Sequence, residues 1–140
     1  MDSEDTNTTH SDESDKSPKK ILFVEDDDAL ANVYISRLQA EGFDVNRVTN
    51  GEDALATALK YKPDLVLLDV MMPKVSGFEV LDIIRNTPET TNLTVIMLTA
   101  LSQEADRKRA EALGVDDYLV KSQVVIADVI SRIKQRLGMS

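Results

Sequence analysis

The chain has 140 residues, with 25 acidic and 16 basic side chains, a net charge of −9 and no cysteine. This length suffices for one domain whose core removes roughly two-thirds of the unfolded chain's surface from water, so folding needs neither a disulfide nor a structural metal. The lack of cysteine excludes thiolate catalysis and zinc–thiolate sites, and the negative charge disfavours direct binding to nucleic acid.

Residues 1–18 differ in composition from the rest of the chain. After Met1 they include no aliphatic residue, and six acidic side chains against one lysine give them a net charge of −5. A segment with so little apolar surface does not offset the entropy of ordering it. We therefore predict a disordered acidic N-terminal tail over residues 1–18, acting as a solubilising extension, and one folded domain over residues 19–140.

The sequence also bears on location. No apolar run approaches the 18 or more residues that cross a bilayer, and the N-terminus lacks a basic segment followed by an apolar one. We expect a cytoplasmic protein without membrane contact.

From residue 19 onward, short apolar runs alternate with stretches whose apolar residues recur every three or four positions. This alternation is typical of repeated βα units around a parallel sheet. Three of the runs are apolar throughout, as in strands covered on both faces. The predicted strands are Ile21–Val24, Phe43–Val48, Leu65–Leu68, Val95–Leu98 and Tyr118–Val120.

A helix is predicted after each strand. Apolar stripes mark the first three helices, the fourth opens at Ser102 and closes at Gly114, and the last runs from Val124 to Leu137. We expect Asp28 to cap the first helix. The sequence thus predicts an α/β fold of five βα units, a doubly wound parallel five-stranded sheet with helices on both faces.

Polar side chains stand after four of the predicted strands. They are Glu25, Asp26 and Asp27 after the first, Asp69 after the third, Thr99 after the fourth and Lys121 after the fifth. Open parallel sheets bind ligands at the carboxyl ends of their strands, and these side chains share one end if the four strands are neighbours. Clustered carboxylates repel one another unless a cation neutralises them, and oxygen ligands favour magnesium over zinc. We therefore predict a Mg²⁺ site.

A phosphoryl group is the expected second component of such a site, because Mg²⁺ usually binds phosphate oxygens alongside one or two carboxylates. Carboxylate attack on phosphorus gives an acyl phosphate, whose charge the metal, the Lys121 ammonium and the Thr99 hydroxyl would stabilise. Asp69 is the expected nucleophile because it stands alone after the most apolar strand. Glu25 and Asp26 are the expected metal ligands.

Four segments resemble, in order, the motifs of the receiver domain of two-component response regulators. The first strand and its acidic pair match in ILFVEDD, the phosphoacceptor strand and its loop in LVLLDVMMPKVSGFEVL, the switch hydroxyl and a small residue in VIMLTA, and the aromatic and the lysine in DDYLVK. The resemblance covers essentially all of residues 19–138. It implies a stand-alone receiver domain with the flavodoxin-like strand order 2-1-3-4-5.

Carried over position by position, the resemblance implies that Asp69 accepts a phosphoryl group from a histidine kinase or a histidine phosphotransfer protein. Asp26 would then coordinate Mg²⁺ directly, Glu25 through a water, and Met71 through its backbone carbonyl. Asp27 falls just outside the acidic pair of the family.

The resemblance also implies a switch. Thr99 would bind one phosphoryl oxygen, with Ala100 leaving room, and Lys121 would pair with another. Tyr118 matches the aromatic that moves inward when the threonine is drawn to the phosphate. The added charge would shift the surface of the fourth helix, fifth strand and fifth helix toward a downstream protein partner. Receiver domains often pair through that surface, so we expect a monomer or a phosphorylation-dependent homodimer.

Two features of the sequence can be compared with the usual receiver-domain pattern. Ser122 follows Lys121 where the family usually has a proline in a cis peptide. A non-proline cis bond costs about 2.5–4 kcal/mol, which favours a trans peptide here, but the sequence alone leaves the isomer open. Met71 and Leu101, each two residues past a site residue, are both apolar. In the family these positions influence access of water to the phosphoaspartate, so we expect slow self-dephosphorylation.

Two other functions stay open from the sequence. A magnesium-dependent phosphatase could use an acid after the first strand as its nucleophile, but such enzymes ordinarily carry an inserted cap, for which this chain has no spare length. A structural interaction domain could keep the fold without using phosphate, which the full set of acids, threonine and lysine disfavours. We expect a phosphoacceptor switch rather than a turnover enzyme, and a protein contact as its output because no DNA-binding segment follows Leu137.

Overall fold

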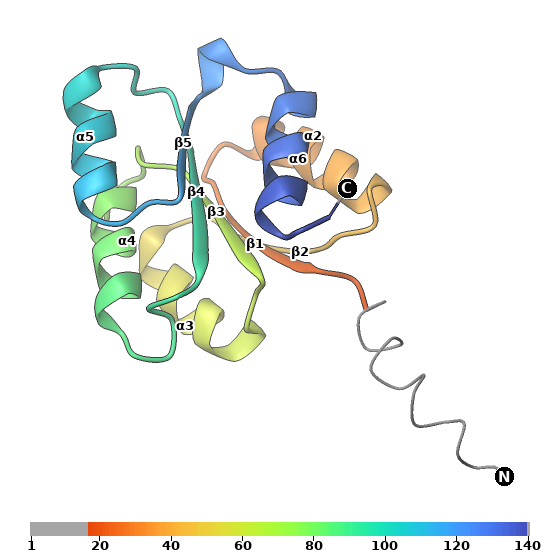
Figure 1. Ribbon diagram of the computed structural model, residues 1–140, viewed down its shortest axis with the longest axis horizontal. Coiled ribbons are helices and arrows are strands. Elements are labelled where there is room, and N and C mark those ends of the chain that lie inside the picture. The colour runs from red at the N-terminus through yellow and green to blue at the C-terminus, as the bar shows by residue number, and fades with distance from the viewer. Residues whose placement is uncertain (1–16, 140) are drawn as a thin grey trace, which may run out of the picture.

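The computed structural model describes residues 17–139, so most of the predicted acidic tail lies outside the described residues. The described chain forms one sheet of five strands flanked by helices (Figure 1). The strands are β1 (Lys20–Val24), β2 (Asp44–Val48), β3 (Leu65–Leu68), β4 (Thr94–Thr99) and β5 (Asp117–Val120). They lie in the order β2-β1-β3-β4-β5, and every neighbouring pair is parallel. The predicted fold class and strand order are therefore confirmed.

Helices cover both faces of this sheet. They are α2 (Asp28–Ala40), α3 (Gly51–Tyr61), α4 (Gly77–Asn86), α5 (Glu104–Ala112) and α6 (Ile126–Arg136), with a 3₁₀ turn η1 (Lys121–Gln123) before the last. Buried residues of α3, α4 and α5 pack on one face of the sheet, and those of α2 and α6 on the other (Figure 1). All four residues of β3 are buried, because helices cover this central strand from both sides.

The first helix begins one residue earlier than predicted. Asp27 is the residue that caps it, because its side chain accepts a hydrogen bond from the Leu30 amide at 3.1 Å. The prediction that Asp28 is the cap is wrong, since Asp28 is already helical. Backbone pairing of β1 with β2 extends one residue past the strand, where the Glu25 amide donates to Val48 O at 3.1 Å, so the turn that follows falls on Asp26 and Asp27.

The last helix begins later than predicted. After β5 the chain makes the η1 turn, and Val124 and Val125 have extended backbones before α6 begins at Ile126. Two arginines of α6 hold the helix to β5. Arg132 and Arg136 both pair with Asp117, at 2.7 Å and 2.6 Å respectively.

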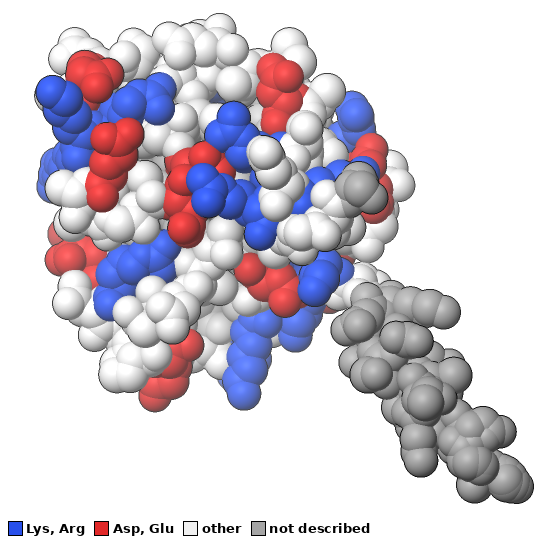
Figure 2. Space-filling view, viewed as in Figure 1, with Lys and Arg blue, Asp and Glu red and all other residues white. Residues whose placement is uncertain are grey.

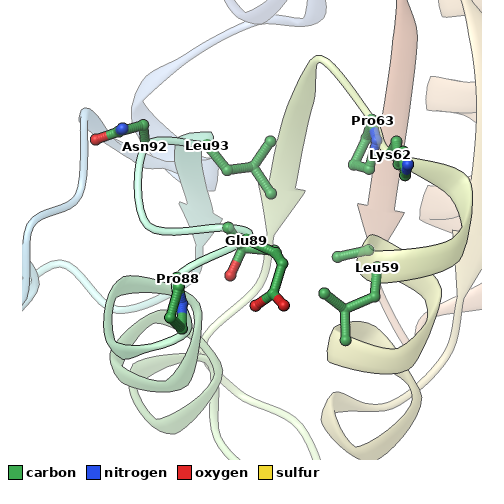
Figure 3. A pocket seen from close by; sticks show the side chains of 9 residues that line it. Leu59, Lys62, Pro63, Pro88, Glu89, Asn92 and Leu93 are labelled. Atoms are coloured by element: carbon green, nitrogen blue, oxygen red, sulfur yellow. The ribbon is translucent and has the colours of Figure 1, made fainter.

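Two features mark the surface of the described residues. Acidic and basic side chains are interspersed on the face shown in Figure 2, with no continuous basic field there. A hollow of about 570 Å³ opens beside the amino ends of β3 and β4, with Leu59, Pro63, Pro88 and Leu93 in its lining (Figure 3). It lies at the opposite end of these strands from the acidic residues.

Across residues 17–139, no helix combines the length and apolar character needed to span a membrane.

Helix α4 begins against the backbone of Asp69. Ser76 caps the helix in a capping box with Glu79, and the Gly77 amide donates to Val70 O at 2.9 Å. A Cβ at position 77 would overlap the carbonyl oxygen of Asp69 and would lie 2.7 Å from Val70 Cα. Glycine is therefore required here so that the helix can pack directly on the segment that carries Asp69.

We expect Gly77→Ala to lower the free energy of unfolding by about 3 kcal/mol, at the upper end of overpacking effects, because the clash is with backbone that cannot rotate away. Chemical denaturation of the variant measures this loss. Gly42→Ala is the control: a Cβ at position 42 meets nothing within 4 Å, so only its positive φ of 94° should cost stability, by about 1 kcal/mol. Equal losses for the two variants would contradict the proposed close packing.

Candidate functional site

Three carboxylates meet at the carboxyl ends of β1 and β3. Glu25 and Asp69 directly follow these neighbouring strands, and the Asp69 amide donates to Val24 O at 3.1 Å, which fixes one strand end against the other. One carboxylate oxygen from each of Glu25, Asp26 and Asp69 lies within 4.8 Å of the others. Glu25 is 1% exposed and Asp69 is 4% exposed, whereas Asp26 is open to solvent. The cluster is therefore partly buried and open on the side of Asp26.

Lys121 brings an ammonium group to the two buried carboxylates. Its Nζ lies 3.0 Å from Glu25 Oε1 and 3.4 Å from Asp69 Oδ2. It reaches them from the end of β5, two strands away from β3, across the edge of the sheet. Residues 17–139 contain no cis peptide bond, so the Lys121–Ser122 peptide, whose isomer the sequence left open, is trans.

Burial and neighbouring charges shift the pKa values of Glu25 and Lys121. Burial raises the pKa of the Glu25 carboxyl above its ordinary value, and the Asp69 carboxylate raises it further, while the Asp27 amide and Lys121 act in the opposite direction. Burial favours the neutral form of Lys121, but Glu25 and Asp69 together outweigh this effect and raise the pKa of the lysine. Lys121 is therefore held in its charged form by the carboxylates that it faces.

One ammonium does not satisfy the cluster. Within residues 17–139, Glu25 Oε1 is buried without a hydrogen-bond partner, since Lys121 Nζ approaches it as an ion pair and outside hydrogen-bonding geometry. A buried carboxylate oxygen without a hydrogen bond is costly even beside an ammonium group, and two further carboxylates lie nearby. The donor set consists of hard oxygens only. These residues fit a divalent cation such as Mg²⁺, which would lie among Glu25, Asp26 and Asp69.

Two further site residues from the sequence lie beside the acids. The Met71 amide donates to Asp69 Oδ1 at 3.3 Å, and the Met71 side chain is 55% exposed. Thr99 is the last residue of β4 and is completely buried, and its Oγ1 accepts a hydrogen bond from the Leu101 amide at 3.3 Å. The hydroxyl of Thr99 is thus engaged by the loop that follows β4.

Tyr118 is placed apart from the carboxylates but is connected to the same loop. Its ring is buried, and its hydroxyl donates to Leu101 O at 2.9 Å. Arg107 of α5 lies over the ring, with Cζ 5.0 Å from the centroid, and its Nη1 donates to Tyr118 O at 3.2 Å. The aromatic therefore lies inward, between the β4–α5 loop and the surface of α5.

One residue at this edge was not predicted from the sequence. Arg47 of β2 donates from Nε and Nη2 to the carbonyl oxygen of Glu25, at 3.0 Å and 2.8 Å. Its signal in the sequence is weak, because an arginine in a strand with one side toward solvent is ordinarily read as a surface residue. The strand register, which pairs Arg47 with Phe23, places it next to the acidic turn.

Comparison with known proteins identifies the family. The family model described as response regulator receiver domain matches residues 21–134. The chain is 42% identical over 118 residues to the phosphate regulon transcriptional regulatory protein PhoB of Rhizobium meliloti, covering 84% of this chain and 52% of PhoB. It is 32% identical over 121 residues to the polar-differentiation response regulator DivK of Brucella anthropi, covering 86% of this chain and 98% of DivK.

A solved structure agrees with these relatives. The Mn²⁺-bound form of response regulator Rcp1 matches with a TM-score of 0.74 and 29% identity, over 84% of this chain and 93% of that chain. The chain spans about half the length of PhoB, and nearly all of DivK. DivK and Rcp1 are named as response regulators, and PhoB is named as a transcriptional regulatory protein. Because the family model covers most of the chain, the protein belongs to the response regulator receiver domains of two-component systems.

Proposed function

We propose that this domain is a phosphorylation-dependent switch that accepts a phosphoryl group on Asp69. The observation that carries the proposal is the convergence of three carboxylates within 4.8 Å of one another, with the Lys121 ammonium 3.4 Å from Asp69 Oδ2. Strand ends that are distant in sequence supply these groups, and each has a use in transfer of a phosphoryl group. A structural domain would have no need for this costly arrangement of buried charge.

In the proposed reaction, an oxygen of Asp69 attacks phosphorus while the P–N bond of a phosphohistidine breaks. The electron pair of that bond goes to the imidazole nitrogen, and the product on this chain is an acyl phosphate. Mg²⁺ bound by Glu25, Asp26, Asp69 and the Met71 carbonyl would neutralise charge on the phosphoryl oxygens. Lys121 would pair with one phosphoryl oxygen, and the Thr99 hydroxyl would donate to another.

The expected donor is a histidine kinase or a histidine phosphotransfer protein, as for receiver domains generally. A magnesium-dependent phosphatase with its nucleophile after β1 would need a second free carboxylate close to Glu25. Asp27 does not supply it, because its side chain caps α2 by accepting a hydrogen bond from the Leu30 amide. The matched relatives are named as a transcriptional regulatory protein and a response regulator, and neither name is that of a phosphatase.

The proposed switch runs through the loop after β4. The Leu101 amide donates a hydrogen bond to Thr99 Oγ1 in this structure. If Thr99 Oγ1 moves toward a phosphoryl oxygen and donates to it, the Leu101 amide must either move with the threonine or lose this hydrogen bond. The Leu101 carbonyl in turn holds the Tyr118 hydroxyl, and Tyr118 lies under Arg107 on α5. A change at the phosphorylation site would thereby reach the surface formed by α5, β5 and α6. We propose that this surface binds the downstream protein partner, or a second copy of the domain.

Incubation with acetyl phosphate and Mg²⁺ tests the proposed phosphoacceptor. We expect intact-mass analysis to show one added phosphoryl group on the wild type and none on Asp69→Asn, because the amide cannot form the acyl phosphate. Asp82→Asn, on the exposed side of α4, is the matched control and should be phosphorylated like the wild type. An adduct that survives in Asp69→Asn, turnover of acetyl phosphate without an adduct, or no adduct on the wild type would each overturn the proposal.

Stability in the absence of divalent cations tests the charge balance of the site. We expect Asp69→Asn to raise the free energy of unfolding by about 1 kcal/mol in EDTA, because it removes one of three mutually repelling carboxylates at the cost of one ion pair with Lys121. Saturating Mg²⁺ should stabilise the wild type and abolish this advantage. Urea denaturation with and without Mg²⁺ measures both effects. A variant that is no more stable than the wild type in EDTA would contradict the proposed repulsion.

The lifetime of the acyl phosphate tests the role of the apolar residues at the mouth of the site. Met71 is exposed beside Asp69, and Leu101 is partly buried in the neighbouring loop. We expect the double variant Met71→Asn, Leu101→Asn to lose its phosphoryl group severalfold faster than the wild type, because polar side chains would hold and orient an attacking water. The decay of the phosphorylated mass after removal of acetyl phosphate gives the rate, and equal lifetimes would refute the prediction.

A further inference from the structure

Arg47 joins the edge strand β2 to the acidic turn after β1. Its Nε and Nη2 both donate to the carbonyl oxygen of Glu25, at 3.0 Å and 2.8 Å, and Nη2 also lies 2.9 Å from Asp28 Oδ1. The side chain is only 17% exposed, although β2 lies at the edge of the sheet. The guanidinium is thus folded over the end of β1 and does not extend into solvent.

These bonds fix the backbone on both sides of Glu25. The amide of Glu25 donates to Val48 O at 3.1 Å, which holds the peptide before it, and Arg47 holds the peptide between Glu25 and Asp26. Both restraints come from adjacent residues of β2. The direction in which the Glu25 and Asp26 side chains leave the backbone is therefore set by β2, a strand that contributes no carboxylate to the cluster.

Charge neutralisation alone does not account for this arrangement. The acidic partner of Arg47 is Asp28, whose side chain is 83% exposed, and ion pairs with such exposed groups contribute little because water screens them. The two donors directed at one carbonyl oxygen instead require the planar fork of a guanidinium, which an ammonium cannot reproduce. The structure favours a geometric role for Arg47 over an electrostatic one.

We infer that Arg47 is a positioning residue for the metal site, holding the Glu25–Asp26 peptide so that the two carboxylates meet Asp69 at the distances that a divalent cation requires. This inference rests on the proposed function, since it assumes that the three carboxylates bind Mg²⁺. It adds a residue outside the cluster on which the affinity for that ion depends.

Titration of the full chain with Mg²⁺, followed by calorimetry and by the amide NMR shifts of residues 25–28 and 69, tests the role of Arg47. We expect Arg47→Gln to bind Mg²⁺ about tenfold more weakly than the wild type. Arg47→Lys should restore little of the affinity, because one ammonium keeps the charge but cannot hold the carbonyl with two donors in a plane. Arg37→Gln is the matched control: Arg37 pairs with Glu41 on α2, away from the cluster, and its loss should leave the affinity unchanged.

An electrostatic role gives the opposite pattern. Arg47→Gln would then bind Mg²⁺ more tightly than the wild type, because a nearby positive charge is removed, and Arg47→Lys would match the wild type. Either result would overturn the inference. Far-UV circular dichroism at the titration temperature identifies variants that are folded, and the lysine variant carries the test if the glutamine variant is not. Failure of the wild type itself to bind Mg²⁺ would refute the proposed function, whereas a wild type that binds and Arg47 variants that bind equally well would refute only the role of Arg47.

Discussion

The buried ion pairs between Lys121 and the carboxylates of Glu25 and Asp69 are the interaction on which the candidate site depends. Two carboxylates, 1% and 4% exposed, share one ammonium, and the exposed Asp26 adds a third negative charge within 4.8 Å. Such burial is expensive in a folded protein unless each charge is compensated. The structure compensates it only in part, because Glu25 Oε1 is left without a hydrogen bond from the described residues. The remaining negative charge is the basis on which we propose that the site binds a divalent cation and, with it, a phosphoryl group.

The fold makes this arrangement possible by bringing together strand ends that are far apart in the sequence. Parallel strands place their carboxyl ends on one edge, and the order β2-β1-β3-β4-β5 puts β1 and β3 side by side at the centre. Helices on both faces bury β1 and β3, so the residues that directly follow these strands are shielded from solvent. Glu25 and Asp69 owe their burial to this position. The cluster is open to solvent at Asp26, which is the side from which the proposed metal ion and phosphoryl donor would approach.

The strands were predictable from the sequence to within one residue at each end. Each buried strand is a short apolar run bounded by polar residues, so local pattern and tertiary environment agree. The helix starts were less predictable. Glu25, Asp26, Asp27 and Asp28 form a continuous acidic run, and any of the aspartates could cap a helix. Only the pairing of Glu25 with β2 decides that Asp27 is the cap, and such long-range pairing leaves no local signal.

The site was predictable in its composition but not in its detail. Polar residues after apolar strands identify Asp69, Thr99 and Lys121 as candidates, because strand ends in this topology share an edge. The sequence does not tell which of the acids after β1 is buried, nor that Thr99 Oγ1 already accepts from the Leu101 amide. The sequence signal of Arg47 is weak for a related reason. Its partner is a backbone carbonyl, and a carbonyl is present at every residue, so no residue type marks it.

The position of Lys121 shows how the site is held without the proline that usually follows this lysine in the family. Two features of the structure restrain the side chain. The backbone leaves β5 into the η1 turn directly at Lys121, and the ammonium lies within 3.4 Å of both buried carboxylates. Because those carboxylates raise the pKa of the lysine, Lys121 keeps its positive charge beside them. The two carboxylates therefore help the η1 turn to hold the Lys121 ammonium in place. A serine at position 122 is compatible with this placement of the lysine.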